Sequence, residues 1–255
     1  MKKILMFLSL ILLLPLSALA VPVDLELSLL VDISGSIVGS EFTLQKQGYE
    51  QAFRDATVIN KITDTAGGDI GAIAANLIYW SGANQQQEVV GWTLIDSATT
   101  SNAFADAIAG TPRPYSGQTG LGEALRFGAD SFTDNGFDAP KQVIDISGDG
   151  GDNDPFIGDT FTSSDGRDYA VSQGIDTING LVIGISSSVL SEYQNDVKYG
   201  SNAFVVQVDD FDDFGPAIKE KIIKEIEPVP EPTSLLLFGT GLLGLFGIGR
   251  RKLRS

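Results

Sequence analysis

The sequence predicts an α/β fold, built as a doubly wound, mostly parallel sheet of six strands with one antiparallel hairpin at its edge. Three observations support this prediction. Apolar segments of strand length alternate along the chain with segments of helical periodicity. The central segments are apolar on both faces, as parallel strands between two helical layers are. One pair of strands is joined by a link too short to contain a crossover helix.

The first elements follow directly from residue periodicity. Residues 23–31 (VDLELSLLV) form a strand whose second half is mostly apolar, as expected of a central parallel strand. A helix is expected at residues 41–56, with Ser40 as its N-cap. Its apolar stripe consists of Phe42, Tyr49, Phe53 and Ala56.

The hairpin is expected between strands at residues 70–80 and 88–95, which are separated only by the polar residues 81–87. Trp80 and Trp92 lie on these two strands. Aromatic residues are common in strands, so both are expected in the core or on the sheet face.

The remaining segments continue the alternation. The residues between 149 and 165 are rich in glycine and aspartate and predict a surface loop. Asp152, Asp154 and Asp159 in that loop do not have EF-hand spacing, so an acidic loop is favoured over a second calcium site. Helices are expected at residues 102–108, 120–132, 166–172, 190–198 and 211–226, and strands at 142–146, 177–185 and 203–208.

Composition removes several classes of function. The 255 residues have a formal net charge of −16, which argues against nucleic acid as a partner because phosphate backbones are bound by Lys and Arg. The chain has no cysteine and no histidine, which excludes disulfides, Cys/His zinc sites, thiol nucleophiles and Ser-His-Asp triads. Any bound metal is therefore expected to be a hard cation on oxygen ligands.

The N-terminus has the features of a secretory signal peptide at residues 1–20. Two lysines precede an apolar stretch, and an Ala-x-Ala site ends at Ala20. Cleavage is expected between Ala20 and Val21. A retained N-terminal anchor is the less favoured alternative.

The C-terminus combines three features in order. Pro230, Glu231 and Pro232 precede an apolar span at residues 233–249, and basic residues follow at 250–254. As a helix the span measures roughly 26 Å, slightly less than a bilayer core of about 30 Å. The basic end is expected to stay cytoplasmic, so the physics predicts a marginal membrane helix.

This order resembles the PEP-CTERM sorting signal of Gram-negative bacteria. The resemblance implies recognition by an exosortase, membrane attachment through the tail before processing, and a final location at the cell surface or outside the cell. A plain tail anchor is the alternative. The expected organisation is a signal peptide at 1–20, one domain at 21–227 and a sorting tail at 228–255. Without both ends, residues 21–229 carry 11 basic and 32 acidic side chains, a net charge of −21.

Oxygen-bearing side chains follow the ends of predicted strands. Asp32, Ser34 and Ser36 end the first strand, Asp149 follows the strand at 142–146, and Thr119 opens a predicted helix. In open α/β sheets ligands bind outside the carboxyl ends of the strands. Hydroxyls and carboxylates suit Mg²⁺, or alternatively Mn²⁺ or Ca²⁺. These residues are therefore predicted to form a metal site.

The same five residues in order resemble the von Willebrand factor type A domain over about residues 24–226. The resemblance implies a Rossmann-like sheet and a metal-ion-dependent adhesion site. It implies Ser34 and Ser36 as direct ligands, Thr119 as a ligand directly or through water, and Asp32 and Asp149 acting mostly through water.

One departure concerns the last loop. Type A domains usually have Thr-Asp-Gly there, whereas this chain has Ser147-Gly148-Asp149-Gly150. That form, with segments such as YWSG and VIDISGDG, is similar to a bacterial type A subfamily of unknown function. The spacing leaves open whether Asp149 coordinates directly.

Each candidate also has a structural alternative. Ser34, Ser36 and Thr119 are residue types common at helix N-caps. Arg113 and Tyr115 are expected either to border the site or to pack within their loop.

Two functions remain. The favoured one is an exported, non-enzymatic adhesion module whose bound cation takes an oxygen group of a protein or polysaccharide. The alternative is a metal-assisted hydrolase, for which the sequence offers no histidine base and no nucleophile elbow. A metal-free scaffold with a degenerate site is the least favoured.

Overall fold

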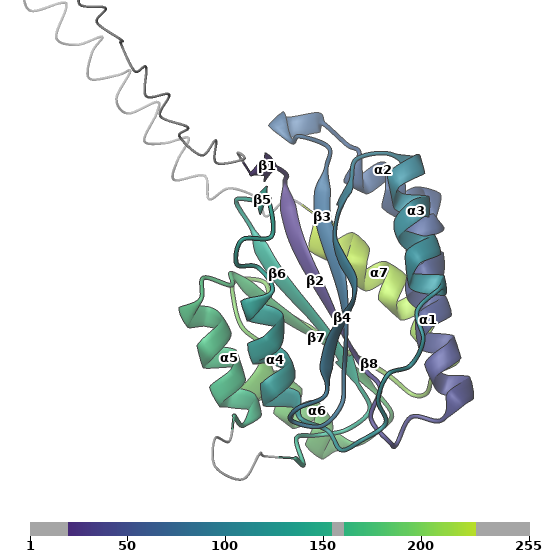
Figure 1. The fold of residues 1–255 in the computed structure, drawn as a ribbon, viewed down its shortest axis with the longest axis vertical. Helices are drawn as coiled ribbons and strands as arrows, with labels where there is room; N and C mark the ends of the chain where they lie inside the picture. Colours follow the sequence, from purple (N-terminus) through teal and green to yellow (C-terminus); the bar gives the residue numbers. More distant parts are fainter. Residues whose placement is uncertain (1–19, 155–160, 228–255) are drawn as a thin grey trace, which may run out of the picture.

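The computed structural model describes residues 20–154 and 161–227. It contains a six-stranded sheet in the order β4-β3-β2-β6-β7-β8, with helices on both faces (Figure 1). The predicted fold class is confirmed. The strands are β2 (Leu25–Asp32), β3 (Ile73–Trp80), β4 (Gln86–Ile95), β6 (Gln142–Gly148), β7 (Thr177–Ile183) and β8 (Val205–Val208).

The central strand β2 pairs in parallel with both β3 and β6, and all eight of its residues are buried. The sheet continues in parallel through β7 to β8. Only β3 and β4 pair antiparallel, which confirms the edge hairpin. The carboxyl ends of β2, β3, β6, β7 and β8 therefore meet at one edge, the lower edge in Figure 1.

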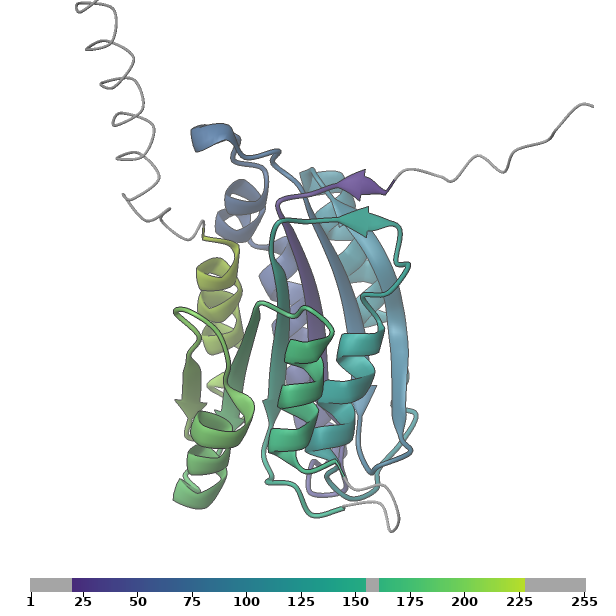
Figure 2. The same cartoon turned by 90° about the vertical axis from the view of Figure 1, so that its left-hand side faces the viewer.

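The helices divide into two layers, which Figures 1 and 2 show on opposite faces of the sheet. Each layer closes its own apolar core against the sheet. One layer consists of α1 (Gly39–Arg54), α2 (Ala56–Ile62), α3 (Ala98–Ala109) and α7 (Phe214–Ile226). The other consists of α4 (Leu121–Asp130), α5 (Ser163–Ser172), α6 (Ser187–Glu192) and the π-helix η2 (Tyr193–Val197).

Glycines set the closest helix contact. A Cβ on Gly122 of α4 would collide with the carbonyl oxygens of Phe161 and Thr162, and one on Gly166 of α5 would collide with the Gly122 carbonyl. Any side chain at either position would separate the two helices. The glycine in the GLGEAL stretch thus serves packing beside the predicted metal loop.

A buried polar network lies between the sheet and α7. Lys221 Nζ is 2.5 Å from Asp145 Oδ1 and 2.7 Å from Glu225 Oε1. Asn179 Nδ2 donates to the same Glu225 oxygen at 3.0 Å. All four side chains are buried, so the network fixes α7 to β6 and β7.

Several boundaries differ from those expected. The prediction of Ser40 as N-cap was wrong, because α1 begins at Gly39 and Val38 holds the cap position, its N–H donating to Glu41 Oε2 at 2.7 Å. The helix expected at 102–108 begins earlier, at Ala98, where Ser97 caps it. Four short elements were not predicted, because they are too short to show a periodic pattern. They are α2, the 3₁₀ turn η1 (Ala66–Gly68), and the paired two-residue strands β1 (Val21–Pro22) and β5 (Phe137–Asp138).

Both tryptophans lie as expected. Trp80 is fully buried, and Trp92 packs on Phe132 with 4.8 Å between ring centroids. The Trp92 Nε1–H donates to the Ser131 carbonyl at 2.7 Å.

Within residues 20–154 and 161–227, no helix combines the length and apolar character needed to cross a bilayer. The signal peptide, apart from Ala20, and the tail with its expected membrane helix at 233–249 lie outside the described residues. The two ends of the described chain, Ala20 and Glu227, lie at the upper edge in Figure 1, opposite the carboxyl ends of the parallel strands.

Candidate metal centre

Three loops meet at the carboxyl edge of the sheet. The first (residues 33–38) leaves β2 just after Asp32, the second (110–120) leads into α4, and the third (149–154) leaves β6. The five residues predicted as metal site lie on these loops or at the end of β2. The topology therefore places them at one edge, as the sequence predicted.

The first and third loops touch through side chains. Ser34 Oγ and Ser36 Oγ are 3.1 Å apart, and Ser36 Oγ donates to Asp149 Oδ1 at 2.8 Å. Asp32 Oδ1 accepts the Ser34 N–H at 2.7 Å, which curls the first loop over the end of its strand. Three hydroxyl or carboxylate oxygens thus form one continuous chain beside Asp32.

The second loop brings Thr119 to the same place. Thr119 is buried, and a Cβ on Gly150 would lie 3.2 Å from its Oγ1. The backbone of Thr119 is held by Asn153, whose Oδ1 accepts the Thr119 N–H at 3.0 Å and whose N–H donates to the Thr119 carbonyl at 2.9 Å. Asn153 was not singled out from the sequence, because an exposed loop asparagine has no distinctive pattern.

Further bonds fix the loops against one another. Gly35 N–H donates to the Gly117 carbonyl at 2.7 Å, and Ser81 Oγ accepts the Gly117 N–H at 2.7 Å. Arg113 Nη2 donates to the carbonyls of Ile33 and Ser34 at 2.8 and 2.7 Å. Arg113 therefore contacts the first loop, which carries Ser34 and Ser36, whereas Tyr115 packs against the apolar core.

The two carboxylates sit in an unfavourable environment for negative charge. Asp32 is fully buried, and this burial raises its pKa to about 7, opposed by the Ser34 N–H and reinforced by the Asp149 carboxylate. Burial also raises the pKa of Asp149. Asp32 Oδ2 is a buried oxygen with no hydrogen-bond partner among the described residues. Such oxygens are costly unless something compensates them.

The donor set fits a small hard cation. Its members are hydroxyl and carboxylate oxygens, the ligands that Mg²⁺, Mn²⁺ and Ca²⁺ prefer. In the described part of the chain no group of three or more acidic side chains is gathered as a metal cluster. A site here would therefore depend on serine and threonine hydroxyls, with Asp32 and Asp149 supplying the balancing charge.

In the third loop, the side chain of Asp154 and the backbone of Asp152 bond to neighbouring segments. Asp154 Oδ2 accepts the Ala83 N–H at 3.0 Å. Burial raises the pKa of Asp152 to about 6, and its backbone N–H donates to Glu192 Oε1 at 3.1 Å. Asp159 lies outside the described residues. Both carboxylate oxygens of Asp152 are buried without a hydrogen-bond partner among the described residues, and the acidic loop stays a prediction.

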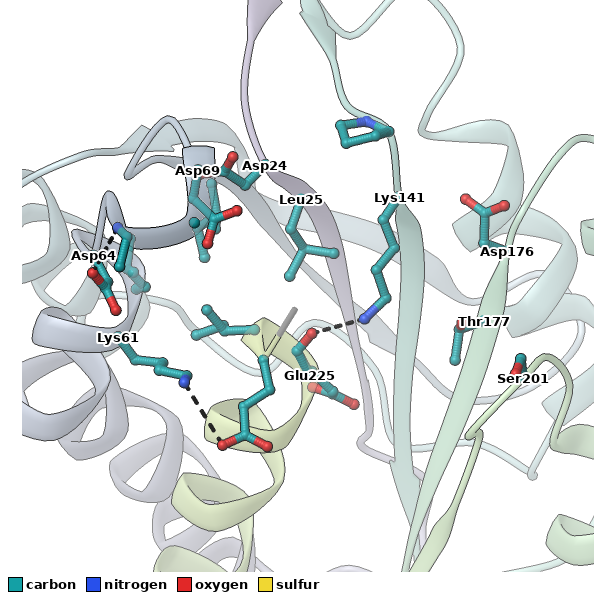
Figure 3. A pocket seen from close by; sticks show the side chains of 17 residues that line it. Asp24, Leu25, Lys61, Asp64, Asp69, Lys141, Asp176, Thr177, Ser201 and Glu225 are labelled. Atoms are coloured by element: carbon teal, nitrogen blue, oxygen red, sulfur yellow. Dashed lines mark hydrogen bonds and ion pairs between the residues drawn. The ribbon is translucent and has the colours of Figure 1, made fainter. Parts of the chain in front are cut away.

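A cavity of about 660 Å³ lies at the opposite edge of the sheet (Figure 3). It is bordered by the start of β2 and the end of α7. Lys141 Nζ donates there to the Glu225 carbonyl at 2.9 Å, and Lys61 Nζ lies 3.7 Å from Glu227 Oε1. This cavity is therefore distinct from the three loops at the carboxyl edge, and its lining mixes acidic and basic groups.

Comparison of the sequence with protein families gives two matches, which together cover most of the chain. Residues 22–230 match the family described as "Protein of unknown function (DUF1194)". Residues 228–252 match the PEP-CTERM protein-sorting motif, which confirms the sorting signal expected there. No curated protein matches the sequence.

Solved structures with the same fold include von Willebrand factor type A domains and proteins of matrix and pili. Proximal thread matrix protein 1 from the mussel byssus, with a zinc-occupied MIDAS motif, is 16% identical at a TM-score of 0.57. The alignment covers 81% of this chain and 49% of that one, so the chain spans about half its length. A von Willebrand factor type A protein from Catenulispora acidiphila is 16% identical at a TM-score of 0.54, over 80% and 43% of the two chains. The vWF domain of the type V pili tip protein Mfa5 from Porphyromonas gingivalis is 10% identical at a TM-score of 0.52, over 84% and 99%. At these identities the likeness establishes the fold.

Proposed function

Because the chain belongs to the DUF1194 family of proteins of unknown function and carries a PEP-CTERM sorting motif, we propose its function from its site. We propose that the domain is an exported, non-enzymatic binding module. It holds one divalent cation at the carboxyl edge of its sheet and uses that cation to bind an oxygen-bearing group of a partner.

One observation carries this proposal. Ser34 Oγ lies 3.1 Å from Ser36 Oγ, which in turn lies 2.8 Å from Asp149 Oδ1, so the three oxygens form a continuous chain. Asp149 is 113 residues from Ser36 in the sequence. Helix capping accounts for a single serine but not for this convergence. In addition, the N-cap residue of α1 is Val38, so neither Ser34 nor Ser36 caps this helix. This weakens the alternative that the two serines are helix caps.

Each residue has a proposed role. Ser34 and Ser36 provide direct hydroxyl ligands, and Thr119 provides a third from the second loop. Asp32 and Asp149 balance the cation charge through bound water. When bound, the cation supplies local positive charge to a domain that is otherwise strongly acidic.

The placement of the site suits a surface module. The metal loops lie at the edge opposite Glu227, to which the sorting tail is joined (Figure 1). A domain tethered through that tail would present its metal loops outward. We propose cleavage after Ala20, attachment through residues 228–255 until an exosortase removes the tail, and then a location at the cell surface or outside the cell.

The partner is proposed by chemistry alone. A carboxylate or other oxygen of a protein or polysaccharide would complete the coordination of the cation. The solved mussel structure has a zinc-occupied MIDAS motif, which supports metal binding by this fold but identifies neither ion nor partner for this chain. The hydrolase alternative is not favoured, because the sequence has no histidine base and its nearest carboxylates, Asp32 and Asp149, belong to the proposed metal set.

The test is titration calorimetry and thermal melting of residues 21–229 with Mg²⁺, Mn²⁺ or Ca²⁺. A cation that binds only the folded state at a hundred times its Kd stabilises it by about 2.7 kcal/mol. We expect one cation per chain for the wild type and no saturable binding for the Asp32→Ala, Ser34→Ala variant.

The matched control is Asp168→Ala, Ser172→Ala, which removes the same groups from the exposed side of α5 and should bind like wild type. A wild type without cation dependence at millimolar metal would overturn the proposed function and leave only the fold assignment.

A further inference from the structure

Tyr193 has a buried hydroxyl that the preceding account does not use. The residue is fully buried, and its Oη has no hydrogen-bond partner among the described residues. It is the first residue of η2. The Lys198 N–H donates to the Tyr193 carbonyl at 2.9 Å, and this bond between residues five positions apart is the one that defines a π-helix. Single π-turns of this kind are frequent at functional sites.

Two glycines on neighbouring strands make room for this side chain. A Cβ on Gly180 of β7 would lie 2.7 Å from Tyr193 Cδ1, so the ring packs directly against the backbone of Gly180. A Cβ on Gly148 of β6 would lie 2.7 Å from Tyr193 Oη. The phenol therefore lies across β6 and β7, with its hydroxyl directed to the end of β6, where the third metal loop begins.

The same point beside Gly148 faces Asp32. A Cβ built there would lie 2.8 Å from Asp32 Oδ2, the carboxylate oxygen that lacks a partner. Its other oxygen, Oδ1, already accepts the Ser34 N–H. A buried donor and a buried acceptor thus flank one small space, and each is costly if left unpaired.

We propose that Tyr193 is a positioning residue of the metal centre, whose hydroxyl holds Asp32 Oδ2, directly or through one bridging water, in the space left by Gly148. A Cβ on Gly148 would lie 2.7 Å from one oxygen and 2.8 Å from the other, so the two oxygens are at most 5.5 Å apart, a separation that one water bonded to both can bridge. This role rests on the proposed function, because Asp32 is assigned there to the metal set.

The inference also gives a reason for the unusual last loop. Where type A domains usually have threonine before the aspartate, this chain has Gly148. The glycine leaves room for the Tyr193 hydroxyl at the end of β6. A Cβ at position 148 would collide with both the phenol oxygen and the Asp32 carboxylate.

The test is Tyr193→Phe, which keeps the ring and removes only the oxygen. Groups that orient metal-binding side chains typically contribute 10- to 100-fold to affinity. We expect the affinity for Mn²⁺ and for Mg²⁺, measured by calorimetry on the purified chain, to fall about 10-fold or more.

The matched control is Tyr49→Phe. Tyr49 is also buried against β6 but on the opposite face, where its Oη lies 3.3 Å from Ser147 Oγ. We expect this variant to keep wild-type affinity for both cations. An equal loss in both variants would overturn the inference, because it would reflect general loosening around β6.

A second measurement needs no metal. The melting temperatures of wild type, Tyr193→Phe, Asp32→Asn and the double variant are compared in chelator. Groups that interact give a double variant whose shift differs from the sum of the single shifts. We expect such non-additivity, and additive shifts would overturn the contact between Tyr193 and Asp32.

The outcomes separate the two proposals. A wild type that binds a cation, together with a Tyr193→Phe variant of equal affinity, overturns the role of Tyr193 and leaves the proposed function intact. A wild type that binds no cation overturns the proposed function, and the positioning role with it.

Discussion

At the scale of single residues, the candidate site is held by a guanidinium. Arg113 Nη2 donates to the carbonyls of Ile33 and Ser34, and Nε donates to the Tyr115 carbonyl at 3.1 Å. One side chain thereby fixes the first loop to the second. The planar guanidinium suits these bonds because its separate nitrogens, Nε and Nη2, donate to carbonyls of both loops.

Replacing Arg113 by methionine should therefore weaken cation binding more than stability. We expect the Kd for Mn²⁺ to rise about 10-fold, since the loop that carries Ser34 and Ser36 loses its anchor. Titration calorimetry measures the change. Arg54→Met, which removes an arginine paired with Glu50 and Asp106 on the surface, is the control and should bind normally. Equal affinity of the Arg113 variant and wild type would contradict this view of the loop.

At the scale of elements, the junction of β6 and α7 contains an unequal set of buried charges. Two carboxyl groups, Asp145 and Glu225, face one ammonium, Lys221. Burial raises the pKa of Asp145 to about 8, with the Glu225 charge raising it further and Lys221 opposing. The folded state thus keeps a proton that the unfolded chain, with an aspartate pKa near 4, releases.

This imbalance predicts that stability decreases as pH rises from 6 to 8. The folded state binds more protons than the unfolded state in that window, so the free energy of unfolding declines by up to about 1.4 kcal/mol per pH unit for each such group. In Glu225→Gln, Asp145 and Lys221 become a one-to-one pair, and the decline should be smaller. Urea unfolding in chelator at pH 6, 7 and 8 measures it.

The control for this prediction is Glu220→Gln, on the exposed side of α7, which should show the wild-type decline. Identical pH dependence in wild type and Glu225→Gln would show that the network does not carry the extra proton.

At the scale of the whole molecule, the main feature is the large negative net charge of the domain. Residues 21–229 have 11 basic and 32 acidic side chains, a net charge of −21. Part of this charge follows β8, where Asp209, Asp210, Asp212 and Asp213 are exposed at the carboxyl end of the strand. This edge also carries the three loops of the proposed metal site, so we expect these carboxylates to attract cations toward it at long range.

Salt should therefore weaken cation binding. Raising NaCl from 20 to 150 mM shortens the screening length to about 8 Å, and we expect the Kd for Mg²⁺ to rise several-fold beyond ordinary competition. The variant Asp209→Asn, Asp213→Asn should reduce this dependence. The control Asp69→Asn, Glu227→Gln neutralises two acids bordering the cavity at the opposite edge and should reduce it less. Equal effects of both variants would indicate that only net charge matters.

The sequence by itself determined the order of the main helices and strands, the edge hairpin and the sorting motif at the C-terminal end. It also determined which oxygen-bearing residues follow the strands. These features are local, because side-chain periodicity and short-range spacing express them directly. Asp32, Ser34 and Ser36 could be identified for this reason, and the carboxyl-edge rule added Asp149 and Thr119.

The tertiary structure alone decided what surrounds those oxygens. Asn153, Ser81 and Tyr193 reach the site across loops and strands that no spacing relates, and Gly148 matters only because two distant side chains approach it. The Asp145–Lys221–Glu225 network likewise joins residues about 80 positions apart, and its pKa shift arises from burial that a linear sequence does not specify. Local patterns predict elements, whereas desolvation and contact across the sheet exist only after packing.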